Sequence, residues 1–458
     1  MLAAKESRAC LAILAVASFL FAPPANAQLA GEVEFARGVG FAQTPGEGPR
    51  TLGRGLPLRE GDRLTTSDSA TAIIKLQDGT RMTVRPNSEI VLQQYQFREN
   101  APDNTFLVQL VRGGFRAVTG LISKNAPNAA RIQTSTATIG IRGTDFDARL
   151  CTGDCSQESN RIAEAARPNA VQASAKITGA QGELYAVDGA GNRRRLVDGG
   201  SVYPGELVET ARGGQAVLVF RDQTRIALGS QTRFRLDNFV YDPDNAGEGR
   251  FLASILRGSV RALTGLIARA NTRNVGFSTA TATIGIRGTG FDVVCLGPCA
   301  GEPATEPGNG TTLWSWLGSI EVGQPGQTAL EVLQAGQGLF IPPTGPIQQI
   351  GNQPNVDAPR PDQVDVPANL FTTENVNDAS QGLFVFVRDG HIEIVSAREV
   401  LHLGRGEAGF AGAQGETGRP PLIPKFMDFD RIPLPTSRNP MLASILGESG
   451  IRSNSVCR

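Results

Sequence analysis

Apolar and polar residues alternate over many short stretches of the chain. In AIIKLQDGTRMTV, residues 72–84, apolar residues occupy every second position on either side of Asp78-Gly79. An alternation of period two predicts strands with one buried face, and Asp-Gly between two such runs predicts a tight hairpin turn. The segment AVLVFRDQTRIAL, residues 216–228, alternates in the same way but lacks the glycine. We therefore expect its turn to differ.

The same pattern occurs twice along the chain. Residues 106–147 and 251–292 align without gaps, and 22 of their 42 positions are identical. Both copies end in nearly the same stretch, first as TATIGIRGTDFD and then as TATIGIRGTGFD. The match extends upstream, where GDRLTT in the first copy faces GELVET in the second. A duplication of this extent predicts two homologous modules.

Changes in composition, together with a second and shorter sequence repeat, set the domain boundaries. We place module 1 at residues 28–168 and module 2 at residues 172–343. Residues 382–412 repeat the closing part of module 2, so they are expected to form a half-module hairpin unit. Residues 348–381 are rich in Pro, Asn and Asp, which predicts a linker, and the Pro-rich residues 413–458 predict an irregular tail.

The composition favours an all-β fold. The chain has 54 Gly and 28 Pro among 458 residues, only 19% of which are charged. Long helical periodicity is absent after the N-terminus, and turns recur every eight to twelve residues, as in sandwiches and barrels. We therefore expect two tandem all-β modules, sandwich-like in their many short strands, and a small C-terminal β unit. With 44 basic and 44 acidic residues the net charge is zero, which argues against nucleic acid as a partner.

The N-terminus has the features of a secretory signal peptide. Lys5 and Arg8 precede an apolar run, and Ala25-Asn26-Ala27 ends the segment with small residues. This arrangement predicts cleavage after Ala27. No later stretch approaches the length of apolar residues that spans a bilayer. We expect a chain that does not span the membrane after cleavage and resides in the periplasm or is secreted.

Five cysteines follow the predicted cleavage site. Four of them form two Cys-x-x-x-Cys pairs, CTGDC and CLGPC, each with a turn residue between the sulfurs. An oxidising compartment favours a local disulfide in each pair. Zinc is the alternative, but neither pair has a histidine or a second cysteine pair close in sequence, so we predict no metal. The pairs are Cys151 with Cys155 and Cys295 with Cys299, while Cys457 is left either free or paired with another chain.

The repeated Gly-Ile-Arg-Gly-Thr stretch allows several interpretations. Backbone amides and an arginine could hold a phosphate, but the flanking residues predict strands rather than the helix of a phosphate-binding loop. We favour a structural role, in which the glycines allow a close approach or a positive φ and the arginine pairs with a carbonyl or a carboxylate. No cofactor is expected. The residues concerned are Gly140, Arg142, Gly143, Thr144, Gly285, Arg287, Gly288 and Thr289.

No catalytic motif is visible. With two histidines in the chain, acid-base chemistry would depend on carboxylates, and Asp147 and Asp292 at the end of the repeat are the available pair. An aspartate at a strand end more often bonds nearby backbone amides. We therefore expect a protein that is not an enzyme.

One pair of tryptophans suggests an alternative function, which is the binding of a glycan. Trp314 and Trp316 alternate in LWSWL, residues 313–317, so they share one face of the predicted strand. Exposed together, they could stack on a sugar ring. Packing beneath a neighbouring layer is the more common role of such aromatics.

The order of motifs resembles the FecR domain. The resemblance rests on GDRLTT, LQDGTRMTV, the strand around Arg-Gly and the close TATIGIRGT, and it covers most of residues 32–340. It implies an all-β, twisted, solenoid-like domain outside the cytoplasm.

The best-known role of that family is iron-uptake signalling, in which a FecR-like protein spans the inner membrane and controls a sigma factor. This chain departs from that pattern, because only nine residues precede the apolar run, too few for a sigma-binding domain. We expect an exported binding, scaffolding or envelope-signalling protein that acts through an envelope protein partner. The alternative is a periplasmic or cell-surface glycan-binding protein.

Overall fold

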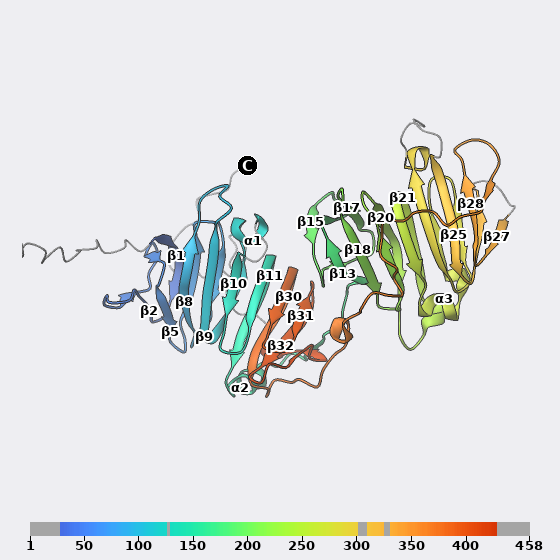
Figure 1. Cartoon of the computed structure of the whole chain (residues 1–458). Coiled ribbons are helices and arrows are strands. Elements are labelled where there is room, and N and C mark those ends of the chain that lie inside the picture. The colour runs from blue at the N-terminus through green and yellow to red at the C-terminus, as the bar shows by residue number, and fades with distance from the viewer. Residues whose placement is uncertain (1–27, 126–128, 301–308, 325–329, 428–458) are drawn as a thin grey trace, which may run out of the picture.

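The protein is described by a computed structural model that covers residues 28–125, 129–300, 309–324 and 330–427. The predicted signal peptide and Cys457 lie outside these residues. The described chain consists mainly of β-strands with three short α-helices, and two similar modules follow one another (Figure 1). The prediction of an all-β protein with two modules is confirmed.

Module 1 is built from two layers of strands, and its longest strands run through both layers. The first half of β9 pairs with β8, and its second half pairs with β7 and β11. The strands of this part of the chain are β1 (Leu29–Arg37), β2 (Gly40–Gln43), β3 (Arg50–Thr51), β4 (Pro57–Arg59), β5 (Arg63–Thr66), β6 (Thr71–Leu76), β7 (Arg81–Val84), β8 (Glu89–Gln96), β9 (Thr105–Val118), β10 (Ala130–Gln133) and β11 (Thr138–Cys151).

Module 2 follows the same plan. Its long strand β21 pairs with β20 and β22 in one half and with β19 and β24 in the other. Its strands are β13 (Ala175–Gln181), β14 (Leu184–Val187), β15 (Arg193–Leu196), β16 (Ser201–Val202), β17 (Leu207–Thr210), β18 (Gln215–Phe220), β19 (Arg225–Leu228), β20 (Arg233–Val240), β21 (Arg250–Leu263), β22 (Val275–Ser278), β23 (Thr283–Ile286), β24 (Gly290–Leu296), β25 (Gly310–Leu317), β26 (Ser319–Gly323), β27 (Leu330–Gln334), β28 (Gln337–Ile341) and β29 (Gln348–Ile350).

Helices are short and lie at the ends of strands. The α-helices are α1 (Leu121–Asn125), α2 (Cys155–Asn160) and α3 (Leu266–Ala270). The 3-10 helices are η1 (Ala246–Glu248), η2 (Thr272–Asn274), η3 (Gly297–Ala300), η4 (Ala368–Leu370) and η5 (Lys425–Met427). Disulfides join Cys151 to Cys155 at the start of α2 and Cys295 to Cys299 at η3, so the predicted pairing is present in both modules.

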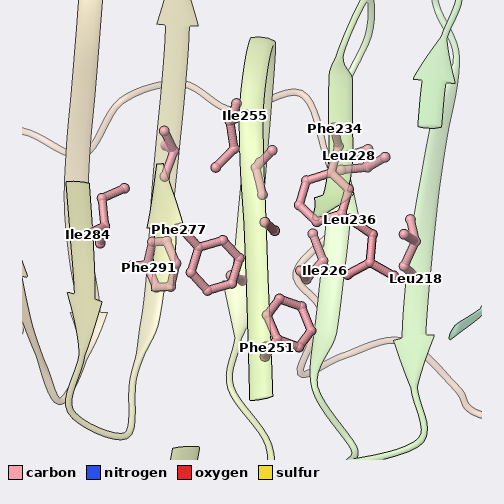
Figure 2. Close-up of a cluster of buried hydrophobic side chains, with 14 of the residues drawn as sticks. Leu218, Ile226, Leu228, Phe234, Leu236, Phe251, Ile255, Phe277, Ile284 and Phe291 are labelled. Atoms are coloured by element: carbon pink, nitrogen blue, oxygen red, sulfur yellow. The ribbon is translucent and has the colours of Figure 1, made fainter. Parts of the chain in front are cut away.

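The alternating apolar positions meet between the two layers of each module. In module 2, buried phenylalanines from different strands contact one another, as Phe251 does with Phe277 and Phe277 with Phe291 (Figure 2). Residues of this kind in two facing layers remove a large apolar area from water, which is the main favourable contribution to folding. Module 1 has an equivalent core, in which Phe115 contacts Phe146.

The C-terminal strands pair with module 1. Strand β30 (Gly382–Val395) runs antiparallel to β11 over its whole length, from Thr138 opposite Val395 to Cys151 opposite Gly382. It is followed by β31 (Val400–Leu403) and β32 (Ala408–Gly412), which both pair with β30. In Figure 1 these strands lie beside β11, between the two modules. The half-module recognised in the sequence therefore supplies the closing strands of module 1, and module 2 is inserted before them.

The segments on either side of β30–β32 pack on the modules. Residues 356–371, within the predicted linker, cover an outer face of module 2 through Val356, Ala358 and Leu370, which are buried against β18 and β19. After β32 the chain forms β33 (Thr417–Gly418) and β34 (Leu422–Ile423). Strand β34 pairs with β12 (Arg167–Pro168). Regular structure thus extends into both segments predicted as irregular.

The hairpin turn of module 2 is the same as that of module 1, which corrects the expectation that it differs. Gln223 has φ +69° where Gly79 has φ +87°. In each turn an aspartate, Asp78 or Asp222, accepts hydrogen bonds from the backbone N–H and the hydroxyl of the threonine two residues later. These two hydrogen bonds stabilise the turn in both modules. The turn of module 2 therefore has the same backbone conformation, with a non-glycine residue in the left-handed region.

Candidate functional site

The repeated Gly-Ile-Arg-Gly-Thr stretch forms a corner where the chain passes from one layer to the other. Gly143 and Gly288 have φ +60° and +71°, as a left-handed corner requires. The facing strand also carries a glycine there, since a Cβ on Gly390 would lie 2.5 Å from the carbonyl oxygen of Gly143. Gly140 and Gly285 have ordinary surroundings in which a Cβ meets nothing closer than about 3.6 Å. One glycine of each motif is thus required by the backbone.

The other motif residues make local contacts that are equivalent in the two modules. Arg142 Nη2 lies 3.3 Å from Glu393 Oε2, and Arg287 pairs with Glu321 in the same way. The backbone N–H of Thr144 donates to Thr119 Oγ1 at 2.8 Å. Arg142 and Arg287 do not share a site. These contacts support the structural role that the sequence suggested for the motif.

Asp147 and Asp292 are buried and ion-paired. Asp147 accepts a hydrogen bond from Arg388 Nε at 2.8 Å, and Asp292 accepts one from Trp316 Nε1 at 3.1 Å. Burial raises the pKa of Asp147 to about 7, although the neighbouring Arg388 and Arg116 oppose the rise. Neither carboxylate lines the large cleft described below, and both are fully buried in their own modules.

The single difference between the two copies of the motif is compensated by a second difference. Asp145 in module 1 forms an ion pair with Arg116 at 2.9 Å. Its counterpart Gly290 leaves room for an indole ring, because a Cβ there would lie 2.3 Å from Cη2 of Trp316. Trp316 stands where module 1 has Arg388, and both side chains donate to the buried aspartate of their own module.

A cleft of about 820 Å³ lies between the two modules. Its walls come from three separate parts of the chain: residues 123–124 and 142–143 of module 1, residues 188–206 of module 2 and residues 389–405 of the C-terminal strands. Because these segments meet only when both modules are assembled, the cleft is a property of the whole molecule.

Basic side chains outnumber acidic ones in this cleft. The lining includes three acidic residues, Asp188, Glu206 and Asp389, and six basic residues, Lys124, Arg142, Arg193, Arg194, Arg195 and Arg405. Part of this charge is neutralised by carboxylates, since Arg194 Nη2 lies 2.7 Å from Glu206 Oε2 and Arg193 Nε lies 3.6 Å from Glu209 Oε2. Arg142 is paired with Glu393. The chain as a whole has no net charge, so the excess of positive charge is local and favours anions.

Strand β15 presents three consecutive arginines at the cleft. It pairs with β14, from Leu196 opposite Leu184 to Arg193 opposite Val187. The next strand in the sheet order, β16, has its residue register with β13 instead. In Figure 1 it lies at the end of module 2 that faces module 1. Arg193 stacks over the Tyr185 ring with its guanidinium carbon 3.4 Å from the ring centroid. The cleft therefore contains a strand edge that is open for pairing.

A pair of histidines in contact lies at the cleft, and one of them, His391, lines it. His402 Nδ1 is 3.3 Å from His391 Nε2, and the two rings are stacked. Burial, together with nearby positive charge, holds the pKa of His391 well below its ordinary value. Burial also lowers the pKa of His402 to about 4, against the opposing charge of Glu393. Both rings are therefore neutral at pH 7. His391 lines the cleft, and its buried Nδ1 has no hydrogen-bond partner among the described residues.

A buried ion triad lies behind the histidines and joins the two modules. Lys176 of β13 donates to Glu407 Oε2 at 2.9 Å, and Arg419 Nε donates to the same oxygen at 2.9 Å. All three side chains are at most 1% exposed. Lys176 Nζ also donates to the carbonyl of His402 at 3.0 Å. Buried charges require such pairing, so these contacts fix module 2 against the closing strands of module 1.

Comparison with known proteins identifies the two modules. Residues 62–160 and 206–302 each match the family model described as FecR protein. The chain contains two FecR domains in tandem. The match agrees with the resemblance read from the motifs, and each matched segment ends at the disulfide that follows the repeated corner.

Other comparisons give distant likenesses. Two crystal structures of a candidate anti-sigma factor from Parabacteroides distasonis ATCC 8503 have 17% sequence identity to the chain and a TM-score of 0.24. The alignment covers 33% of this chain and 60% of theirs, which is less than two thirds of the length of those relatives. No curated protein matches the chain.

The tryptophans proposed as a sugar-stacking pair are engaged within the second FecR domain. Trp316 lies against Gly290, and the guanidinium carbon of Arg360 stands 4.4 Å from its ring centroid. Trp314 packs over Gly338, where a Cβ would lie 2.6 Å from its ring. Both side chains are half-buried. With Arg360 over the Trp316 ring and Trp314 on Gly338, the pair offers no support for glycan binding.

The cleft was missed in the sequence because its walls are distant along the chain. The one local signal was RRRL at residues 193–196, which alternates poorly and stands out in a neutral chain. Within the described residues, no three His, Cys, Asp or Glu side chains converge as a metal site. No helix in that part of the chain combines the length and the apolar character that crossing a bilayer requires.

Proposed function

We propose that this chain is an exported, non-enzymatic scaffold of the cell envelope that binds a protein partner. The observation that carries the proposal is the way the two FecR domains are joined. Module 1 is closed by strands that follow module 2, and the triad of Lys176, Glu407 and Arg419 is buried between them. Two domains held at a fixed relative position suit the presentation of a composite surface.

Several features support the location and the absence of catalysis. Residues 1–27 have the composition of a signal peptide, and the two disulfides are typical of an oxidising compartment. The carboxylates closest to a catalytic arrangement, Asp147 and Asp292, are occupied by arginine or indole partners in the interior. Envelope signalling through protein contacts is consistent with the FecR domains.

The test is site-specific photo-crosslinking in cells that produce the chain. A photoreactive residue is placed at exposed positions in turn, including Arg195 in the cleft, Arg98 in module 1 and Arg273 in module 2. The scaffold predicts that at least one position yields a crosslink to one envelope protein, which binds the purified chain. If crosslinks fail to form at all positions while the protein is folded and exported, the proposed function is wrong.

A further inference from the structure

We propose that the cleft binds an extended, acidic peptide segment of the protein partner, with its carboxylates on the cleft arginines and its backbone along the open edge of β15. This inference rests on the proposed function and names the partner chemistry of one surface. It combines three observations, which are the charge of the lining, the unpaired strand edge and the buried nitrogen of His391.

The first observation is the distribution of positive charge. Lys124, Arg195 and Arg405 are exposed in the cleft and have no carboxylate partner among the described residues. They belong to three separate segments, so their convergence is produced by the assembly of the two modules. Arginine presents a planar fork that binds a carboxylate through two hydrogen bonds, which favours carboxylate ligands at these positions.

The second observation is the strand edge. One side of β15 pairs with β14, whereas β16, the next strand in the sheet order, has its residue register with β13. Arginines on an edge strand protect it from pairing with similar edges. The same charges attract an acidic strand, which can add to the sheet through main-chain hydrogen bonds. Arg193 and Arg195 point to the same face of β15. Arg195 is available to a carboxylate of such a peptide, and Arg193 would exchange its 3.6 Å contact with Glu209 for a second carboxylate two positions along the peptide.

The third observation is His391, which lines the cleft. Its Nδ1 is buried and lacks a partner among the residues that the structure describes. The neutral ring can donate a hydrogen bond from this atom while Nε2 accepts one from His402. A buried donor without an acceptor is costly. A ligand carboxylate that reaches His391 in the cleft would satisfy it.

A peptide fits these features better than a lipid or a free phosphate. Among the lining residues, only Val197, Pro204 and Tyr203 have apolar side chains, so an acyl chain would lie mainly against charged and polar side chains. A phosphate ion could use the arginines but not the open strand edge. The occupant that uses the charge, the edge and the buried donor together is an extended chain with acidic side chains.

The test is fluorescence anisotropy with the full chain and a labelled peptide in which Glu alternates with Val. The variant R193S/R195S is compared with R212S/R273S, a control that removes two exposed arginines of module 2 outside the cleft. We expect the first variant to lose about tenfold in affinity, since two charge-assisted contacts contribute at least the 1.4 kcal/mol that corresponds to this factor. The control should stay within about twofold of wild type. Circular dichroism checks that both variants are folded.

Three further arms separate the sources of binding. A peptide with alternate backbone amides methylated should bind more weakly if it pairs with β15. Displacement by millimolar inorganic phosphate would overturn the proposal in favour of a small-anion site. Binding to phosphatidylglycerol vesicles in preference to the peptide would overturn it in favour of a membrane surface. Equal losses in the two arginine variants would also overturn it. If the peptide fails but crosslinks to a protein persist elsewhere, the scaffold function stands and the cleft assignment is wrong.

Discussion

At the scale of single residues, equivalent positions of the two modules can be compared directly. Asp145 and Gly290 differ because their modules fill the same space differently, with an ion pair to Arg116 in one case and an indole ring in the other. The motif itself predicted that glycines and arginine serve the backbone and local pairing. It could not reveal Trp316 as the partner of Gly290, because side-chain packing across strands depends on register.

The pair of hairpin turns gives a first prediction. Gln223 holds φ +69° in a turn where module 1 has a glycine, and a left-handed conformation is unfavourable for a residue with a Cβ. We expect Gln223→Gly to increase the free energy of unfolding by about 1 kcal/mol, as measured by urea denaturation. The matched change Gly79→Gln should lower it by a similar amount. Destabilisation by Gln223→Gly would show that the glutamine side chain contributes more than the strain costs.

The Gly290 and Trp316 pair gives a second prediction. Gly290→Asp introduces a Cβ within 2.3 Å of the indole, so we expect a loss of about 1–3 kcal/mol in unfolding free energy, as for an overpacked core. Adding Trp316→Arg recreates the combination of Asp145 and Arg388 found in module 1. The double variant should therefore be more stable than the sum of the single changes predicts. Additive losses in a double-mutant cycle would contradict the coupling.

At the scale of elements, local patterns predicted strands and turns but not their partners. The period-two alternation identified the hairpins. Residues 382–412 were recognised by their similarity to the closing part of module 2. Their pairing with β11 joins residues more than 230 positions apart, and nothing in a local pattern specifies such a contact. Proline-rich composition also predicted a linker at residues 348–381, although Val356 and Leu370 are buried there.

The strands β30–β32, which close module 1 although they follow module 2 in the sequence, give a third prediction. Deletion of residues 382–427 removes β30, which pairs with β11 along its full length and contributes Leu383, Val385 and Ile392 to the core of module 1. We expect the truncated chain to lose the unfolding transition of module 1 and to keep that of module 2, as measured by calorimetry. A separate peptide of residues 372–427 should restore the missing transition by strand addition. Two intact transitions in the truncated chain would contradict this dependence.

At the scale of the whole molecule, the interface between modules should respond to pH. His391 and His402 remain neutral in the folded protein because burial lowers the pKa of both, that of His402 to about 4. In the unfolded chain they bind protons near pH 6.5. The unfolded state therefore binds more protons as the pH falls from about 6.5 to about 4. Both histidines lower the stability across this range, His402 by about 3 kcal/mol.

The measurement is a comparison of variants, because Asp147 acts in the opposite direction. Its pKa is raised to about 7, so the folded state binds that proton first and gains stability as the pH falls below 7. We expect the variant H391Q/H402Q to lose less stability than wild type between pH 6.5 and pH 4 in urea titrations. Identical pH profiles for the two proteins would show that the histidines do not titrate as inferred.

The buried triad yields a final prediction that depends on its unequal charge. Two cations, Lys176 and Arg419, share the one carboxylate of Glu407. Burial alone would raise the pKa of Glu407, but the two cations outweigh it and hold the pKa below its ordinary value. Lys176→Met leaves a neutral pair of Glu407 and Arg419, whereas Glu407→Met leaves two buried positive charges with carbonyl partners but without their shared carboxylate. We expect the second change to lower the unfolding free energy by about 3–5 kcal/mol and the first to lower it clearly less, as measured by chemical denaturation.

Because the triad joins the modules, Glu407→Met should also separate their thermal transitions and raise the radius of gyration in small-angle scattering. Equal losses from the two changes would mean that packing, rather than charge, holds the modules together.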